Sequence, residues 1–148
     1  MGRKTRSGRP AAEFAHRQFW RVFRERHPRE PQLRVRNGPW FWQRPMLDHG
    51  IVVSMYVAPA RNLVGVFFGR NERIGAVRVD ERLAALRPAL IDRLGLRPDQ
   101  LGDFDGFASV WRVNVFAEDN FAAMADWMVT ESYRVEAAVR AILADAAA

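Results

Sequence analysis

The pattern of apolar and polar positions is most strand-like over residues 50–69, which read GIVVSMYVAPARNLVGVFFG. Two β-branched and aromatic runs flank a breaker at residues 58–62, as is typical of an antiparallel hairpin. Alternation separates two sets of side chains on each strand: Ile51, Val53, Met55 and Val57 from Val52, Ser54 and Tyr56 on the first, and Val64, Val66 and Phe68 from Leu63, Gly65 and Phe67 on the second. Because both faces are mostly apolar, we expect the hairpin in the middle of a sheet that helices cover on at least one side.

Helical periodicity is found on both sides of this hairpin. A first helix is predicted from just after Pro10 to about Arg26. Its spacing separates an apolar side (Ala12, Ala15, Phe19, Val22 and Phe23) from a charged side (Glu13, Arg17, Arg21 and Arg24). A long C-terminal helix after Asp119 is predicted to cross the sheet with an apolar stripe (Phe121, Met124, Ala125, Met128, Ser132, Val135, Val139, Ile142 and Leu143).

Weaker patterns complete the order of elements. Residues 39–44 and 107–116 favour strands, and residues 70–78 favour a polar connection. A helix after Asp80 should end at Gly95, and Pro88 either kinks it or opens a second short helix. The sequence thus predicts an α+β fold with the order α-β-β-β-α-β-α and an antiparallel sheet of about four strands. We expect a disordered basic tail over residues 1–10 and a single domain over residues 11–148.

Composition narrows the class of protein. The 148 residues are 49% hydrophobic, enough for the core of one domain. The absence of cysteine excludes disulfides, thiolate catalysis and cysteine-ligated metals, and it favours a cytoplasmic location. No apolar stretch approaches the ~20 residues that a membrane-spanning helix needs, so we expect no membrane insertion.

Charge is concentrated near the N-terminus. Residues 1–36 contain 11 Lys or Arg against three Glu, a net charge of +8, whereas the remaining residues have a net charge of −2. Of the 23 basic residues only Lys4 is a lysine, a bias that a GC-rich genome would also produce. The arginine count alone therefore does not establish phosphate binding.

No catalytic, metal or cofactor site is predicted. The histidines His16, His27 and His49 have no second ligand at metal-binding spacing on their own elements. The acidic pairs lie at element ends or in loops, where carboxylates cap helices and accept turn hydrogen bonds. No serine lies in a nucleophile elbow, and no glycine-rich phosphate loop is present.

Nucleic acid is the partner that the remaining features favour. Arginines combined with aromatic residues are typical of surfaces that follow a phosphate backbone and stack on bases. The candidate binding residues are Arg3, Lys4, Arg6, Arg9, Arg17, Arg21, Arg24, Trp40, Trp42 and Arg44. In the alternative interpretation, Arg17 and Arg21 pair with Glu13 and Glu25 along the helix and the tryptophans belong to the core.

The chain also resembles a bacterial family called domain of unknown function 4268. The residues that carry the resemblance lie between about positions 14 and 135: Gln18-Phe19-Trp20, Gly50, Val64-Gly65-Val66, Val79-Asp80 with Leu83, Leu94-Gly95, and Trp127. The resemblance implies a domain that is often the C-terminal part of restriction-endonuclease-like and phage-defence proteins, with no established catalytic residues.

Two functional hypotheses follow from the sequence. The first is a non-catalytic accessory domain that contacts nucleic acid through its basic N-terminal third, beside a nuclease or defence protein. The second is a protein-interaction or self-association module, including a homo-oligomer, that does not bind nucleic acid.

Overall fold

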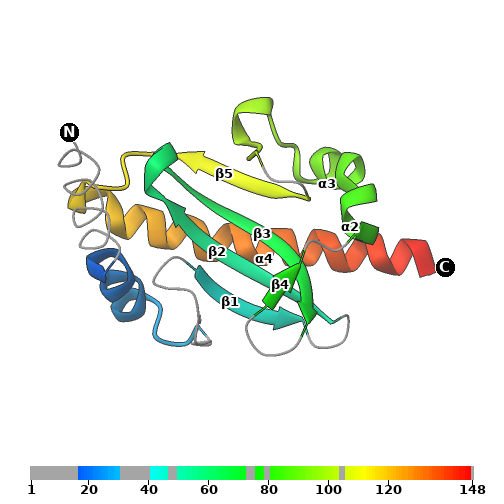
Figure 1. Ribbon diagram of the computed structural model, residues 1–148, viewed down its shortest axis with the longest axis horizontal. Coiled ribbons are helices and arrows are strands. Elements are labelled where there is room, and N and C mark those ends of the chain that lie inside the picture. Colours follow the sequence, from blue (N-terminus) through cyan, green and yellow to red (C-terminus); the bar gives the residue numbers. More distant parts are fainter. Residues whose placement is uncertain are drawn as a thin grey trace, which may run out of the picture.

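The computed structural model describes residues 17–30, 41–46, 50–72, 76–78, 81–103 and 106–147. These residues form an α+β fold in which one antiparallel sheet packs against helices, as the sequence predicts (Figure 1). The strands are β1 (Phe41–Met46), β2 (Ile51–Ala58), β3 (Leu63–Glu72), β4 (Ala76–Arg78) and β5 (Ala108–Arg112). The helices are α2 (Glu81–Ala85), α3 (Arg87–Leu94) and α4 (Phe121–Ala147), and residues 17–26 are also helical.

Strand β3 is the centre of the sheet. It pairs with β2 along one edge, and β1 continues the sheet on the far side of β2. The other edge of β3 is shared, because β5 pairs with residues 63–67 and β4 with residues 70–72. The predicted central hairpin is therefore confirmed, and all four strand pairings are antiparallel.

Strand β4 corrects the prediction for residues 70–78. These residues are not a plain connection, because β3 runs to Glu72 and β4 pairs back onto it through Arg70↔Arg78 and Glu72↔Ala76. Main-chain hydrogen bonds between the three-residue β4 and the end of β3 need no apolar alternation, which is the signal that the sequence lacks here. Within the described residues, the sheet consequently has five strands.

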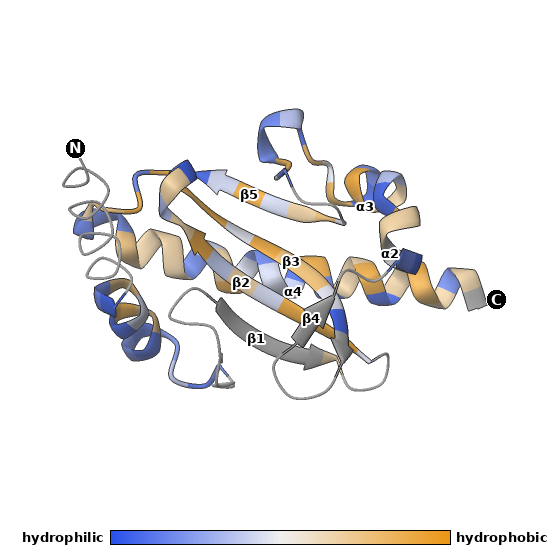
Figure 2. Cartoon of the chain, viewed as in Figure 1, coloured by the Kyte–Doolittle hydropathy of each residue, from blue (hydrophilic) through white to orange (hydrophobic). Residues whose placement is uncertain are grey.

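The two faces of the sheet bury two separate clusters. The face toward α4 carries one predicted set from β2 and one from β3, which the register of the hairpin brings together in the main core with the helices. Leu63, Phe67, Ala108 and Val110 form a smaller buried cluster on the opposite face. Figure 2 shows the hydrophobic colouring along β2, β3 and β5 that accompanies this two-sided burial.

Helix α4 follows the predicted stripe. It runs along the sheet (Figure 1) and packs against β2, β3 and α3. The stripe residues from Phe121 to Ile142 are buried and Leu143 is partly buried, so the periodicity correctly identifies the inner face. Arg134 of α4 donates a hydrogen bond to the Leu94 carbonyl at 3.0 Å, which joins α4 to the end of α3.

The chain forms two short helices around Pro88, as one of the two predicted arrangements requires. Pro88 lies in the first turn of α3, where its missing N–H costs no helical hydrogen bond. Gly95 ends α3 with a left-handed conformation (φ +65°), as expected of a glycine just past a helix.

Strand β5 is shorter than the predicted strand over residues 107–116. Its pairing with β3 ends at Leu63↔Arg112, because β3 begins there. The next main-chain donors bind Asn62 instead: Val113 N donates to its carbonyl and Val115 N to its side-chain Oδ1, each at 3.1 Å. The turn between β2 and β3 therefore holds the segment that follows β5.

Candidate functional site

The helix over residues 17–26 presents a basic outer face, formed by Arg17, Arg21 and Arg24. All three are exposed, and Phe19 and Phe23 on the opposite side are buried. The ring of Phe19 lies 5.7 Å from that of Phe121, edge to face, at the start of α4. The arginines therefore project from a helix that is fixed to the core.

Glu25 is an acidic residue on the same helix, next to the basic outer face. It lies four residues after Arg21, and the two side chains approach to 3.8 Å while both remain more than 60% exposed. Such surface pairs contribute little and exchange readily with other charged partners. Within the described part of the chain, no ion pair involves Arg17 or Arg24.

Asp126 fixes the end of this helix to α4. Arg26 donates two hydrogen bonds to the Asp126 carboxylate, both at 2.7 Å, and His27 Nε2 lies 2.8 Å from Oδ1. These contacts, led by the Arg26 hydrogen bond, lower the pKa of Asp126 to about 2. No local pattern predicts this cluster, because Asp126 follows His27 by 99 residues.

Two further candidate binding residues belong to the sheet. Trp42 and Arg44 lie in β1, where their backbones pair with Met55 and Val53. Arg3, Lys4, Arg6, Arg9 and Trp40 lie outside the described residues. Of the ten candidates, the structure thus places Arg17, Arg21 and Arg24 together.

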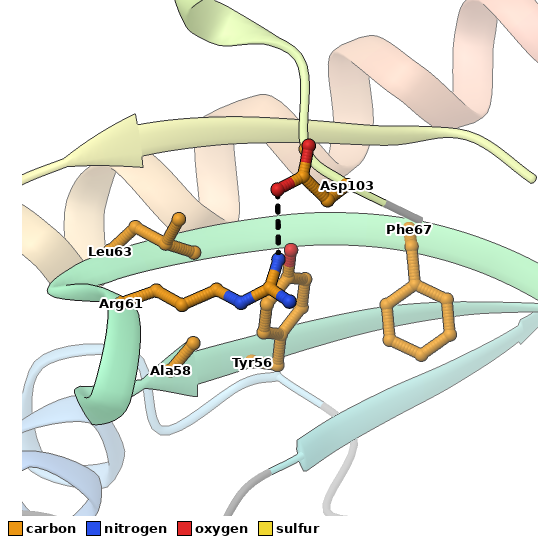
Figure 3. Close-up of a pocket in the computed structure, with 7 residues that line it drawn as sticks. Tyr56, Ala58, Arg61, Leu63, Phe67 and Asp103 are labelled. Carbon is orange, nitrogen blue, oxygen red and sulfur yellow. Dashed lines mark hydrogen bonds and ion pairs between the residues drawn. The ribbon is translucent and has the colours of Figure 1, made fainter. Parts of the chain in front are cut away.

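A half-open cavity lies on the sheet face that carries the smaller cluster (Figure 3). Its volume is about 210 Å³, and its lining comes from β2, β3, the turn between them and the loop before β5: Tyr56, Ala58, Arg61, Leu63, Phe67, Gly102 and Asp103. Arg61 donates a hydrogen bond from Nη1 to Asp103 Oδ2 at 3.2 Å across the lining. The alternation of the strands places Tyr56 and Phe67 on sheet faces, but no local pattern predicts a cavity.

Tyr56 lies flat on the sheet next to this cavity. A Cβ atom added to its cross-strand partner Gly65 would lie 2.5 Å from Tyr56 Cε1, Cζ and Oη, so only glycine leaves room for the ring. Phe67 meets the Tyr56 ring edge to face, with ring centres 5.5 Å apart. Burial raises the pKa of the Tyr56 hydroxyl to about 12, although the positive charges of Arg61 and Arg112 act to lower that pKa. The hydroxyl is therefore protonated at neutral pH.

A second, more polar cavity of about 260 Å³ lies at the outer edge of β5. The tryptophans Trp111 and Trp127 line it with ring centres 6.0 Å apart, together with Arg97 and Arg112. Asp99 is held by Arg97 at 3.1 Å, and that hydrogen bond lowers the pKa of Asp99. The pairing neutralises much of the charge that Arg97 brings to this cavity.

The described residues contain no cluster of three His, Asp or Glu side chains that could hold a metal ion. One of the acidic pairs in the sequence is Asp103 with Asp105. Asp103 binds Arg61, and Asp105 lies outside the described residues. Ser54 and Ser109 are buried on the strands. In the described part of the chain, no helix has the length and apolarity that crossing a bilayer demands.

A scan against protein-family models found no family that matches this chain, and searches of curated proteins and of solved structures found no match either. The resemblance to domain of unknown function 4268 therefore remains a prediction from the residues that carry it.

Proposed function

We propose that this chain is a non-catalytic binding domain that contacts nucleic acid through the basic residues of its N-terminal third. The observation that carries the proposal is the row of exposed arginines on the helix over residues 17–26. Arginine contacts to phosphate supply most of the affinity of sequence-independent nucleic-acid binding. A helix held by buried aromatic rings and by Asp126 presents these side chains in a fixed arrangement.

The setting that the family resemblance implies fits this proposal. A domain that holds nucleic acid without cutting it would position a nuclease or defence protein encoded separately. The exposed arginines of the helix over residues 17–26 offer the binding surface that such a role needs.

Binding of a fluorescent 20-nucleotide strand and of the matching duplex, followed by anisotropy at low salt, tests the proposal. We expect the variant R17Q/R21Q/R24Q to weaken both complexes by at least about tenfold, since three phosphate contacts are lost. The matched control, R82Q/R93Q/R97Q, removes the same charge from exposed arginines elsewhere and should change affinity far less. Absence of binding by the intact chain, or equal losses in the two variants, would contradict the proposal.

A protein-interaction or self-association module is the second candidate function. It is favoured by Phe116, which is 42% exposed in the turn that leads toward α4. Large apolar side chains at such exposure are common at protein interfaces, although single ones are also ordinary surface features. A chain that sediments as a monomer at high concentration, with or without F116S, would count against self-association.

A further inference from the structure

The cavity beside Tyr56 and the basic helix face lie on different sides of the sheet. The helix over residues 17–26 packs into the main core through Phe19 and Phe23, on the side of α4. The cavity opens on the face of the smaller cluster, lined by Leu63 and Phe67 (Figure 3). A ligand in this cavity would therefore meet residues other than those of the basic helix face.

The shape and lining of the cavity suit a planar ring. Tyr56 lies flat against the backbone of Gly65, and Phe67 stands edge to face beside it. Ala58 and Leu63 add apolar surface. A volume of about 210 Å³ is below the ~300–1,000 Å³ of pockets that hold drug-sized ligands, so one ring system is the appropriate size.

The rim of the cavity favours an anionic group attached to that ring. Arg61 and Asp103 are 57% and 85% exposed, so their ion pair is weakly held by the fold and a stronger anion can replace it. Arg112 is exposed beside Leu63 on the paired strand, and its positive charge acts on the Tyr56 hydroxyl. Arg112 lies outside the lining, which itself holds one arginine and one aspartate, and it adds a positive charge to the surroundings of the cavity.

We propose that this cavity binds a nucleotide unit, with its base in the cavity beside Tyr56 and its phosphate on Arg61. The Tyr56 and Phe67 rings supply the aromatic surface beside which a base can lie. A bound phosphate would replace Asp103 as the partner of Arg61, since arginine binds phosphate through paired N–H groups. The unit can be a free mononucleotide or one nucleotide of a single strand, and the site does not depend on the basic helix face.

Titration calorimetry with three small probes tests the ligand chemistry. AMP carries base and phosphate, adenosine lacks the phosphate, and ribose 5-phosphate lacks the base. We expect AMP to bind with a Kd on the order of 1 mM or below, adenosine to bind at least about fivefold more weakly, and ribose 5-phosphate to give no measurable heat. Equal binding of AMP and adenosine, or of AMP and ribose 5-phosphate, would overturn the proposal.

Four variants locate the site. Ala58→Leu should fill the cavity and abolish AMP binding, whereas Arg61→Gln should weaken AMP about fivefold and leave adenosine unchanged. Asp103→Asn should strengthen AMP binding about two- to threefold, because it removes the carboxylate that competes for Arg61. Arg93→Gln, an exposed arginine on α3, is the charge-matched control. If Ala58→Leu does not fold, the variants of the exposed residues Arg61 and Asp103 still test the site, because they should change AMP affinity in opposite directions. Absence of these two changes would contradict the proposal.

Two further measurements show whether the nucleotide is free or part of a strand, and they separate this proposal from the proposed function. AMP binding should survive R17Q/R21Q/R24Q, whereas strand binding should not. If a ten-nucleotide strand also loses affinity in Ala58→Leu, the cavity takes a nucleotide of the strand; if it does not, the cavity takes free nucleotides. Strand binding that depends on the helix arginines, without AMP binding and without an effect of Ala58→Leu, would overturn the cavity proposal alone.

Discussion

At the scale of single residues, the contacts with the clearest energetic consequences join parts of the chain that are distant in sequence. Asp126 of α4 accepts two hydrogen bonds from Arg26 at 2.7 Å, although its side chain is 44% exposed. Tyr56 rests on Gly65 across the hairpin. Each contact predicts a measurable loss of stability when one partner changes.

Replacing Asp126 by Asn should lower the free energy of unfolding by about 1 kcal/mol at pH 7, a value reduced for solvent screening. The folded state lowers the pKa of Asp126 to about 2, so the unfolded chain binds this proton more tightly. The stabilisation is therefore complete above the ordinary Asp pKa of about 3.9 and is lost as the pH falls toward 2. Urea unfolding of both proteins between pH 7 and pH 2.5 should show the difference shrinking below pH 4.

Asp145→Asn provides the control for that series. Asp145 is exposed in the last turns of the same helix, so its replacement should change stability little at any pH. A difference between wild type and Asp126→Asn that stays constant down to pH 2.5 would contradict the role of the Arg26 contact.

Gly65→Ala should destabilise the fold by about 1–3 kcal/mol, the usual cost of overpacking. The added Cβ would lie 2.5 Å from Tyr56 ring atoms, so the ring must leave its position. Thermal unfolding of Gly65→Ala in the wild-type and Tyr56→Ala backgrounds forms a double-mutant cycle. The cost should be much smaller without the ring, and an equal cost in both backgrounds would show that the contact is not the cause.

At the scale of elements, Asn62 couples the β2–β3 turn to the segment after β5. It adopts a left-handed conformation (φ +53°), and its carbonyl and side chain accept the Val113 and Val115 N–H groups. Asparagine combines tolerance of this conformation with a side-chain acceptor. The hairpin and β5 are therefore expected to unfold together.

A graded set of Asn62 variants tests this coupling. Asn62→Asp keeps the acceptor and should change the free energy of unfolding by less than about 0.5 kcal/mol. Asn62→Gly keeps the backbone conformation but loses the acceptor, at a cost of about 1 kcal/mol, and Asn62→Ala should cost more because it also strains the backbone. Denaturant unfolding measures the stability of each variant. If Asn62→Gly is as stable as Asn62→Asp, the side-chain hydrogen bond contributes nothing.

Sequence patterns predicted the elements whose burial is periodic and missed those defined by pairing alone. The stripe of α4 and the alternation of the hairpin correspond to buried faces. Strand β4 and the length of β5 depend on where β3 begins and ends, which no local pattern contains. The cavity joins Arg61 to Asp103 across 42 positions, so its lining could not be grouped before the fold was known.

At the scale of the whole molecule, the sheet separates two surfaces with different chemistry. One side holds α4 and the helix over residues 17–26, whose outer arginines are exposed. The other side holds a small apolar cluster and the cavity beside Tyr56. A chain built this way could hold a phosphate backbone on one side and a single nucleotide on the other, and the two activities should be separable by mutation.

The salt dependence of strand binding tests the central claim most directly. The logarithm of the binding constant for a single-stranded 20-mer, plotted against the logarithm of salt concentration, has a slope of about −0.7 per phosphate contact. We predict that R17Q/R21Q/R24Q makes this slope shallower by about 2, while R82Q/R93Q/R97Q leaves it nearly unchanged. The same slope in both variants, or no binding by the intact chain at the lowest salt concentration, would contradict nucleic-acid contact through the helix over residues 17–26.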